Sequence, residues 1–85
     1  MSTVPTASDL EKHVCSLIAE FGGIPPEQVT PSAHLEELDV DSLDLVELSQ
    51  IVEEEHGIQL PAQEFEGVQT VRDVVAVVVR NASVT

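Results

Sequence analysis

Ser42 is the residue of this chain whose type and neighbours best suit covalent chemistry. It stands directly after Asp41, and Asp44 follows two positions later. If Asp41 caps the helix that starts here, Asp44 falls at the third helical position and Ser42 at the first, with its hydroxyl turned toward solvent. That position lies beside free amides and the positive end of the helix dipole, which favours a phosphate. The simpler alternative is that Ser42 only starts the helix.

The same serine lacks what a catalytic nucleophile needs. Its acidic neighbours Asp39, Asp41 and Asp44 oppose tight binding of a free phosphate but tolerate a covalent phosphodiester. No spacing in the chain identifies a general base or an oxyanion hole for Ser42. Ser42 is therefore not expected to be a self-activated nucleophile, and we expect no enzyme and no catalytic residue in this chain.

The acids around Ser42 do not form a calcium loop of the EF-hand type. Counting from Asp39, position five is Leu43, position six is Asp44 in place of glycine, and Gln50 stands where the closing glutamate belongs. We predict only weak divalent binding, which would relieve repulsion among the carboxylates.

The histidines and the cysteine offer little further chemistry. His13, His34 and His56 are far apart in sequence, so they do not indicate a zinc site. Cys15 lies beside the apolar stripe of the first expected helix, in the helix interior and without basic neighbours. It is predicted to be a small buried hydrophobe rather than a reactive thiol.

Length and charge limit the class of protein. The chain has 85 residues, with three basic and sixteen acidic side chains and a formal net charge of -13. This charge excludes nucleic acid and anionic membranes as main partners and favours basic protein surfaces. The 42% hydrophobic share argues for a folded domain, and the single cysteine excludes an internal disulfide. No signal peptide and no apolar run long enough to cross a bilayer is visible, so we expect a cytoplasmic protein. We also expect it to be a monomer.

Periodicity and capping patterns predict three main helices. The first opens at Ser8, with Glu11 three residues on, and Gly22, Gly23 and Pro25–Pro26 end it and forbid a restart. A long ordered loop follows as far as residue 41. Its expected apolar anchors are Ile24, Val29, Leu35, Leu38 and Val40, and the apolar stripe of the first helix is Leu10, Val14, Leu17, Ile18 and Phe21.

The second helix is expected from residue 41 or 42 to His56, with Gly57 as its terminator. After Pro61 a short helical turn covers roughly residues 62–66. Thr70, with Asp73 three residues on, caps the last helix. That helix places Val71, Val74, Val75 and Val78 on one face. The valines at 74–79 also allow a strand by β-propensity, but the cap and spacing favour the helix.

The second helix is expected to have two unlike faces. Leu45, Leu48 and Val52 form its core side, with Ser49 and His56 at the margin. The opposite side sets two apolar residues among polar ones, which is typical of a docking surface with an apolar centre and a charged rim. The alternative is that the two apolar residues pack under the long loop. The members of this side are Leu43, Val46, Glu47, Gln50, Glu53 and Glu54.

Asp41-Ser42-Leu43, between Leu38-Asp39-Val40 and Asp44-Leu45-Val46-Glu47-Leu48, resembles the acyl carrier proteins, especially the small type of dissociated fatty-acid and polyketide synthases. The likeness continues through Glu53-Glu54-Glu55 and the segment 57–61 to the valine-rich end. It departs at His56, where fatty-acid carriers usually have an aromatic, and at Leu45, where many have threonine. Asp39-Val40 replaces the glycine pair typical of peptidyl carriers.

The resemblance implies an all-α four-helix bundle with three main helices and one short one. It implies that Ser42 carries a 4′-phosphopantetheine arm, attached from coenzyme A by a phosphopantetheinyl transferase. The arm would hold acyl groups as thioesters for acyl transferases, ketosynthases or other basic-surfaced biosynthetic enzymes. Asp41, Leu43, Asp44, Val46, Glu47 and Glu54 would form the surface that these partners read.

We expect one carrier domain over residues 1–85, ordered over about 8–80, with loose tails at 1–7 and 81–85 that favour a stand-alone protein. The alternative function is an unmodified acidic helical adaptor for basic proteins. That alternative explains the charge and the mixed face of the second helix, but not a serine at the helix start between aspartates.

Overall fold

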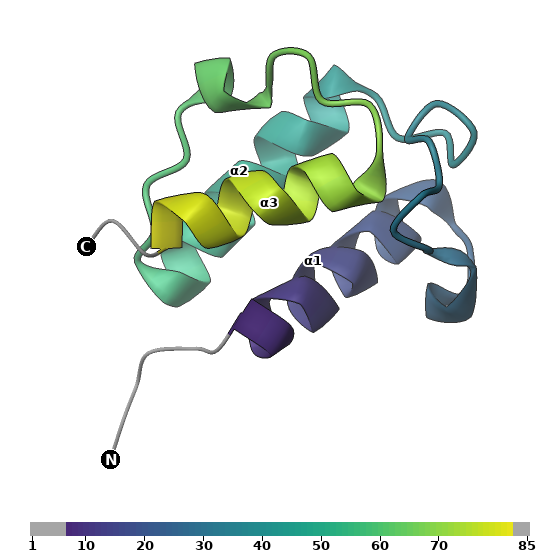
Figure 1. Cartoon of the computed structure of the whole chain (residues 1–85), viewed down its shortest axis with the longest axis horizontal. Coiled ribbons are helices and arrows are strands. Elements are labelled where there is room, and N and C mark those ends of the chain that lie inside the picture. Colours follow the sequence, from purple (N-terminus) through teal and green to yellow (C-terminus); the bar gives the residue numbers. More distant parts are fainter. Residues whose placement is uncertain (1–6, 83–85) are drawn as a thin grey trace.

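A computed structural model describes the backbone of residues 7–82 and the side chains of residues 9–82, and it is all-helical (Figure 1). Three α-helices, α1 (Ala7–Gly22), α2 (Ser42–His56) and α3 (Val71–Ala82), are joined by segments that contain two 3₁₀ turns, η1 (Pro26–Gln28) and η2 (Ala62–Phe65). Within this range the only β-type pairing is an isolated bridge between His34 and Thr70. The expected all-α class is therefore confirmed.

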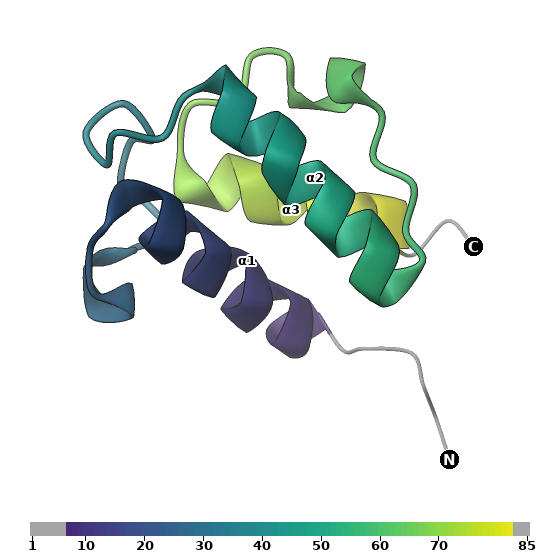
Figure 2. The same cartoon turned by 180° about the vertical axis from the view of Figure 1, so that it is seen from behind.

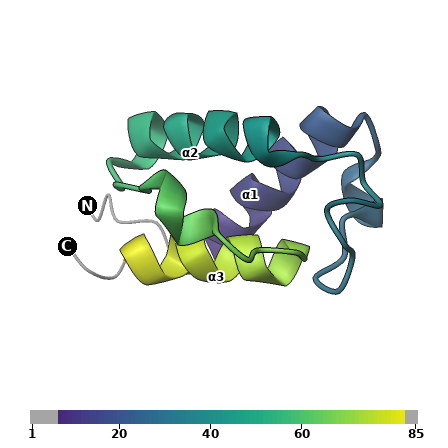
Figure 3. The same cartoon turned by 90° about the horizontal axis from the view of Figure 1, so that it is seen from above.

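The helices are arranged around one aliphatic core. α2 and α3 run in the same direction and are separated from each other, and α1 runs in the opposite direction, below them in Figure 1 and behind them in Figure 3. The first turns of α1 therefore lie near the last turns of α2, as the reverse view shows (Figure 2). The turn η2 packs against both α2 and α3, so the chain between these helices fills part of the space that separates them.

α1 buries the stripe that its periodicity predicts. Leu10, Val14, Leu17 and Ile18 are buried, and Phe21 is half-buried. The helix begins at Ala7, one residue before the predicted cap Ser8, whose side chain lies outside the described ones. It ends at Gly22 as predicted, where a Cβ atom would lie only 2.5 Å from the carbonyl oxygen of Leu38. Gly22 is therefore required because the loop backbone approaches the helix end closely.

One detail of the loop prediction is wrong. Pro25 and Pro26 do not prevent a helical turn, because η1 begins at Pro26, and Val29 donates its N–H to the Pro26 carbonyl at 3.0 Å. Proline suits the first position of a helical turn, since its missing N–H would have no partner there. The predicted anchors hold the loop down: Val29, Leu35 and Val40 are buried, and Ile24 and Leu38 are partly buried.

The loop is also tied to the start of α3 by backbone hydrogen bonds. Leu35 donates its N–H to Gln69 at 2.9 Å, Val71 donates to Ala33 at 3.0 Å, and Arg72 donates to Pro31 at 2.9 Å. These bonds connect segments that are more than thirty residues apart in sequence. The long connection is thus an ordered structural element, and it fixes where the chain enters α2.

The remaining helix ends follow the predicted chemistry. Gly57 ends α2 in the left-handed region with φ 68°, which glycine adopts without strain. At the start of α3, Thr70 and Asp73 exchange side chain–backbone hydrogen bonds of 3.3 and 3.1 Å. This cap stabilises the start of α3, in a segment whose β-propensity alone would also allow a strand. The backbone N–H groups of Gln69 and Thr70 also hold the pKa of Asp73 below its usual range.

α3 differs from its prediction in two places. Val77 is buried in addition to Val71, Val74 and Val78, whereas Val75 is only half-buried. Asn81 belongs to the helix, not to a loose tail, and its amide donates to the Val77 carbonyl at 2.8 Å. The other tail predictions, at residues 1–6 and 83–85, lie outside the described residues.

The expected fourth helix is a 3₁₀ turn of four residues rather than an α-helix. Arg80 of α3 forms an ion pair with Glu64 of this turn at 2.5 Å, and Asn81 donates to the same carboxylate at 3.2 Å. These contacts lower the pKa of Glu64, with the Arg80 hydrogen bond as the largest cause. Of the helices in residues 7–82, none has the length and apolar character that a membrane span requires.

Candidate functional site

The site begins with the capped first turn of α2. Asp41 is the N-cap residue, and its Oδ1 accepts the backbone N–H of Asp44 at 3.1 Å. In return, Oδ2 of Asp44 accepts the backbone N–H of Asp41, also at 3.1 Å. Ser42 is consequently the first residue of the helix, and it is exposed, as the spacing of the two aspartates predicted.

A tight turn before α2 aims this serine outward. Val40 is buried and donates its N–H to the Leu35 carbonyl at 3.0 Å, which closes the turn. Asp39 adopts the left-handed region with φ 60°, a conformation that aspartate tolerates better than most residues. The buried Val40 therefore fixes the backbone next to the cap and leaves the Ser42 hydroxyl at the surface.

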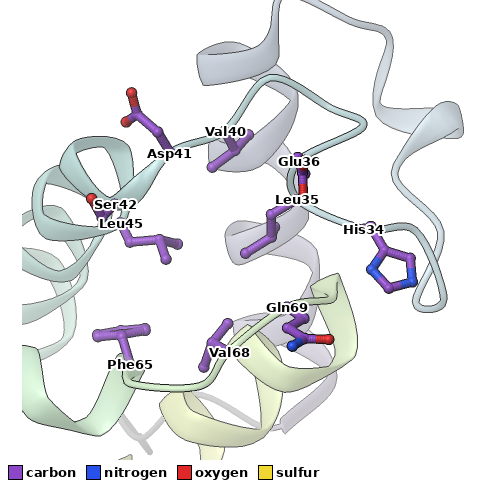
Figure 4. A pocket seen from close by; sticks show the side chains of 10 residues that line it. All are labelled: His34, Leu35, Glu36, Val40, Asp41, Ser42, Leu45, Phe65, Val68 and Gln69. Atoms are coloured by element: carbon purple, nitrogen blue, oxygen red, sulfur yellow. The ribbon is translucent and has the colours of Figure 1, made fainter.

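A cavity of about 610 Å³ opens beside Ser42 between the long loop, α2 and the segment before α3 (Figure 4). Apolar side chains from these three parts of the chain project into it, including Leu45, Phe65 and Val68. Polar groups such as His34 and Gln69 lie at its other side. The cavity thus has a mixed lining, apolar on one side and polar on the other, with an exposed serine at its edge.

A second cavity of about 260 Å³ lies between α2 and η2. It shares Ser42, Leu45 and Phe65 with the first cavity, and Val46, Ser49 and Ala62 complete most of its wall. The buried Ser49 hydroxyl donates to the Val46 carbonyl at 2.7 Å, so this polar group is satisfied within the helix. Leu45 and Phe65 therefore stand between two spaces that both reach Ser42.

The two faces of α2 are as predicted, except that Glu53 does not belong to the outer one. Leu45, Leu48 and Val52 are buried, whereas Leu43 is 76% and Val46 43% exposed. These exposures exclude the alternative in which Leu43 and Val46 pack under the long loop. Both are large apolar residues that the described structure leaves in solvent, which makes this side of the helix a candidate interaction surface.

The acids of that surface are not equivalent. Glu47 and Glu54 are exposed. Glu53, by contrast, uses Oε2 to accept the backbone N–H of Leu60 at 2.7 Å, so it stabilises the link after α2 instead of facing a partner. Asp44 is half-buried, and one of its oxygens is engaged in the cap. We call the set Asp41, Leu43, Asp44, Val46, Glu47 and Glu54 the α2 docking face.

Cys15 has the character that the sequence predicted. It is half-buried, and burial, together with the nearby Glu11 carboxylate, raises the pKa of its thiol. A thiol with a raised pKa is mostly protonated at neutral pH and therefore a poor nucleophile. Within residues 9–82 no group of three or more histidine, cysteine or acidic side chains is placed to hold a metal ion.

Sequence reasoning missed the contact between His13 and His56. Their Nδ1 and Nε2 atoms lie 2.9 Å apart, although the residues are 43 positions apart in sequence. Both residues flank buried positions, since His13 precedes Val14 and His56 follows Val52 by one helical turn. Two polar residues at the margins of two apolar stripes are the signal that could have indicated the pair.

Comparison with known proteins agrees with this geometry. Residues 12–78 match the family model described as the phosphopantetheine attachment site. The chain is 40% identical over 74 residues to "Acyl carrier protein 2" of Ralstonia nicotianae, which covers 86% of this chain and 91% of that protein. It is 36% identical over 72 residues to the "Meromycolate extension acyl carrier protein" of Mycolicibacterium smegmatis, with 84% and 73% covered.

The protein of the same name in Mycobacterium tuberculosis is 35% identical over 72 residues, 84% of this chain. That match spans 63% of the longer mycobacterial protein, less than two thirds of its length. The fold and the matched model define a helical domain of the class that bears phosphopantetheine. The chain belongs to the acyl carrier protein family, whose members carry acyl groups rather than catalyse reactions, and whose cofactor is 4′-phosphopantetheine.

Proposed function

We propose that Ser42 is the attachment residue and that the chain carries acyl intermediates between the enzymes of a fatty-acid, polyketide or related biosynthesis. The observation that carries the proposal is the exposed serine at the first position of a doubly capped helix. Its hydroxyl is accessible to a modifying enzyme, and the helix start favours the phosphate of a phosphodiester. When bound, the arm supplies a terminal thiol that holds the acyl group as a thioester.

The protein's own residues present this serine to partners. We infer that the α2 docking face binds a phosphopantetheinyl transferase first and later the acyl transferases, ketosynthases or other basic-surfaced enzymes that use the arm. The exposed Leu43 and Val46 supply a small apolar centre, and Glu47 and Glu54 supply charge around it. A net charge of -13 steers basic partners quickly but holds them in a salt-sensitive way, which suits a carrier that must dock and leave repeatedly.

The two cavities give the carried group a place beside its attachment point. Both reach Ser42, and their shared residues Leu45 and Phe65 are apolar. An acyl chain lying there is removed from water, which lowers its free energy by about 25 cal/mol for each Å² of apolar surface buried. The leucine at position 45 narrows this space relative to a smaller side chain, so it helps to set which acyl groups fit.

The proposal extends to the organisation of the chain. We infer that the helices of residues 7–82 act as one carrier domain, because α1 packs against both α2 and α3 in a shared core. The names of the mycobacterial relatives refer to meromycolate extension. For this chain the proposal is limited to acyl intermediates of fatty-acid or polyketide type, handled in the cytoplasm by a monomer.

The proposal is tested by modification of the purified chain. It is incubated with coenzyme A and a broad-specificity phosphopantetheinyl transferase, and its intact mass is measured beside Ser42→Ala and Ser16→Ala variants. Ser16 is an exposed serine on α1 and serves as the matched control. We expect the wild type and Ser16→Ala to gain one phosphopantetheine, and Ser42→Ala to gain none.

Two results would overturn the assignment of Ser42. One is modification of the Ser42→Ala variant. The other is an unmodified but folded wild type, when the same transferase modifies a different carrier; the second result would favour the acidic adaptor, which needs no prosthetic arm.

A further inference from the structure

The contact between His13 and His56 joins two helices through a pair of imidazole rings. Nδ1 of His13 on α1 lies 2.9 Å from Nε2 of His56 on α2, and the ring centroids are 5.0 Å apart with an interplanar angle of 65°. The separation is that of a hydrogen bond, in which one nitrogen donates and the other accepts. One of the facing nitrogens must therefore be without a proton.

The neutral pair and the pair with one extra proton both satisfy every contact; in the neutral pair, Nε2–H of His56 donates to Nδ1 of His13, whose Nε2–H faces Glu55. Nε2 of His13 lies 3.6 Å from Oε1 of Glu55, so a protonated His13 pairs with this carboxylate on one side. Its Nδ1–H then donates to the unprotonated Nε2 of a neutral His56 on the other side. A pair that holds one extra proton thus links α1 to two consecutive residues of α2.

A second proton removes this link. Protonated histidine carries an N–H on both ring nitrogens, so Nδ1 of His13 and Nε2 of His56 would both be donors. They would face each other at 2.9 Å with no acceptor between them, and two positive charges would repel. The rings must then separate, which loosens α1 from the last turn of α2.

The two facing nitrogens are in direct contact, so no charged side chain lies between them as an acceptor. On α1, Asp9 precedes His13 by one turn and Lys12 adjoins it. On α2, Glu53 is engaged by the Leu60 amide at 2.7 Å. On α3, Arg80 forms its ion pair with Glu64 of η2. Glu55 is the carboxylate in contact with the pair, and it pairs with the outer nitrogen of His13, not with the nitrogens that face each other.

We propose that His13 and His56 form a proton-dependent link between α1 and α2, which holds while at most one of the two imidazoles is protonated and breaks when both are. The link lies at the far end of α2 from Ser42, fourteen residues or about 20 Å along the helix. It therefore acts on the packing of the bundle and not on the attachment residue. It also explains the histidine at position 56, since an aromatic residue there could not share a proton with His13.

The direction of the pH effect follows from proton uptake. The contact disfavours a doubly protonated pair only in the folded chain, because the unfolded chain does not hold the two rings together. Where the unfolded state binds more protons, stability increases with pH. The contribution of the link to the free energy of unfolding is thus lost when the pH falls far enough to protonate both rings. Carboxylate repulsion decreases over the acidic range, so it changes the free energy of unfolding in the opposite direction.

The first test is an NMR titration of the unmodified wild-type protein, in which imidazole C–H resonances are followed between pH 8 and pH 5. His34 is exposed, lies outside the pair and serves as an internal reference. We expect the His13 and His56 resonances each to report two separated steps, because coupled groups titrate as a pair. Three independent single-step curves would overturn the proposal.

The second test compares urea unfolding of the wild type with that of His56→Phe, which keeps a ring of similar size but has no ring nitrogen, and with that of His34→Gln as the matched control. Loss of one hydrogen bond changes the folding equilibrium constant by about 5-fold. We expect the folding equilibrium constant of the wild type, divided by that of His56→Phe, to fall by about this factor between pH 7.5 and pH 5. The same ratio of wild type to His34→Gln should stay constant. A pH-independent His56→Phe ratio would contradict the link. Both readouts use the chain without phosphopantetheine, so they stand apart from the test of Ser42.

Discussion

Asp41 and Asp44 each accept the other's backbone N–H across the first turn of α2, at 3.1 Å in both directions. The same two carboxylates flank Ser42 and belong to the α2 docking face. Under the proposed function they have two separable roles, because the cap needs only a hydrogen-bond acceptor, whereas a basic partner would need the negative charge. Substitutions that keep the acceptor and remove the charge can distinguish these roles.

Asp41→Asn and Asp41→Ala form such a matched pair of substitutions. Asparagine retains an acceptor for the Asp44 N–H, so we expect it to leave the free energy of unfolding nearly unchanged. Alanine removes the cap and is expected to cost about 1 kcal/mol. Both variants lose the charge, so both should raise the KM of a phosphopantetheinyl transferase for this chain, measured beside urea unfolding curves. Equal destabilisation by the two substitutions would show that the charge, and not the hydrogen bond, supports the helix start.

The sequence predicted the start of α2 well because capping is local chemistry within four residues. Asp41, Ser42 and Asp44 fix their own positions whatever packs around them. The buried stripe of α1 was predictable for the same kind of reason, since it depends on the period of one helix.

Other features depend on where distant segments meet, and the sequence did not reveal them. The approach of the Leu38 carbonyl to Gly22, the His13–His56 contact and the cavities beside Ser42 all need the tertiary arrangement. Glu53 shows the same limit, because helical projection placed it with the outward acids, whereas its carboxylate binds the Leu60 amide seven residues on.

Val46 and Val52 are two valines on opposite sides of α2 that test the docking face. Val46 is 43% exposed and Val52 is fully buried. We expect Val46→Ala to change the free energy of unfolding by no more than about 0.5 kcal/mol but to weaken partner binding about 5-fold, as loss of an apolar contact at an interface does. Val52→Ala should instead cost about 2 kcal/mol of stability and leave the affinity of the folded fraction unchanged. The measurements are the KM of the transferase for each variant and the thermal unfolding of each variant. If Val46→Ala is unstable but has a normal KM, Val46 belongs to the core and not to the docking face.

Phe65 lines both cavities beside Ser42, and this leads to a prediction about the length of the carried acyl group. A sheltered chain stabilises the folded protein, because it binds the folded state only. In the wild type we expect the melting temperature of acyl-loaded protein to rise with chain length and then level off when one cavity is filled. In Phe65→Ala the cavities merge, so the rise should continue to longer chains. Leu43→Ala is the control, since Leu43 lines neither cavity. Identical length profiles for wild type and Phe65→Ala would show that Phe65 does not limit the space.

Divalent cations should stabilise the chain more than monovalent salt does. The chain has sixteen acidic side chains and only three basic ones, so carboxylates are crowded on α2. Glu53, Glu54 and Glu55 are consecutive there, and Glu47 lies earlier on the same helix. Magnesium or calcium at millimolar concentration lowers this repulsion in the folded chain, where the carboxylates are closest together. A gain of about 1 kcal/mol would raise the melting temperature by about 4–8 °C for a chain of this size.

Thermal unfolding of the wild type is measured with magnesium chloride and with sodium chloride at equal ionic strength, and the Glu47→Gln variant is measured in both salts. The variant should start from a higher melting temperature and gain less from magnesium; equal effects of the two salts on the wild type would mean that general screening, and not association with the helix acids, accounts for the gain.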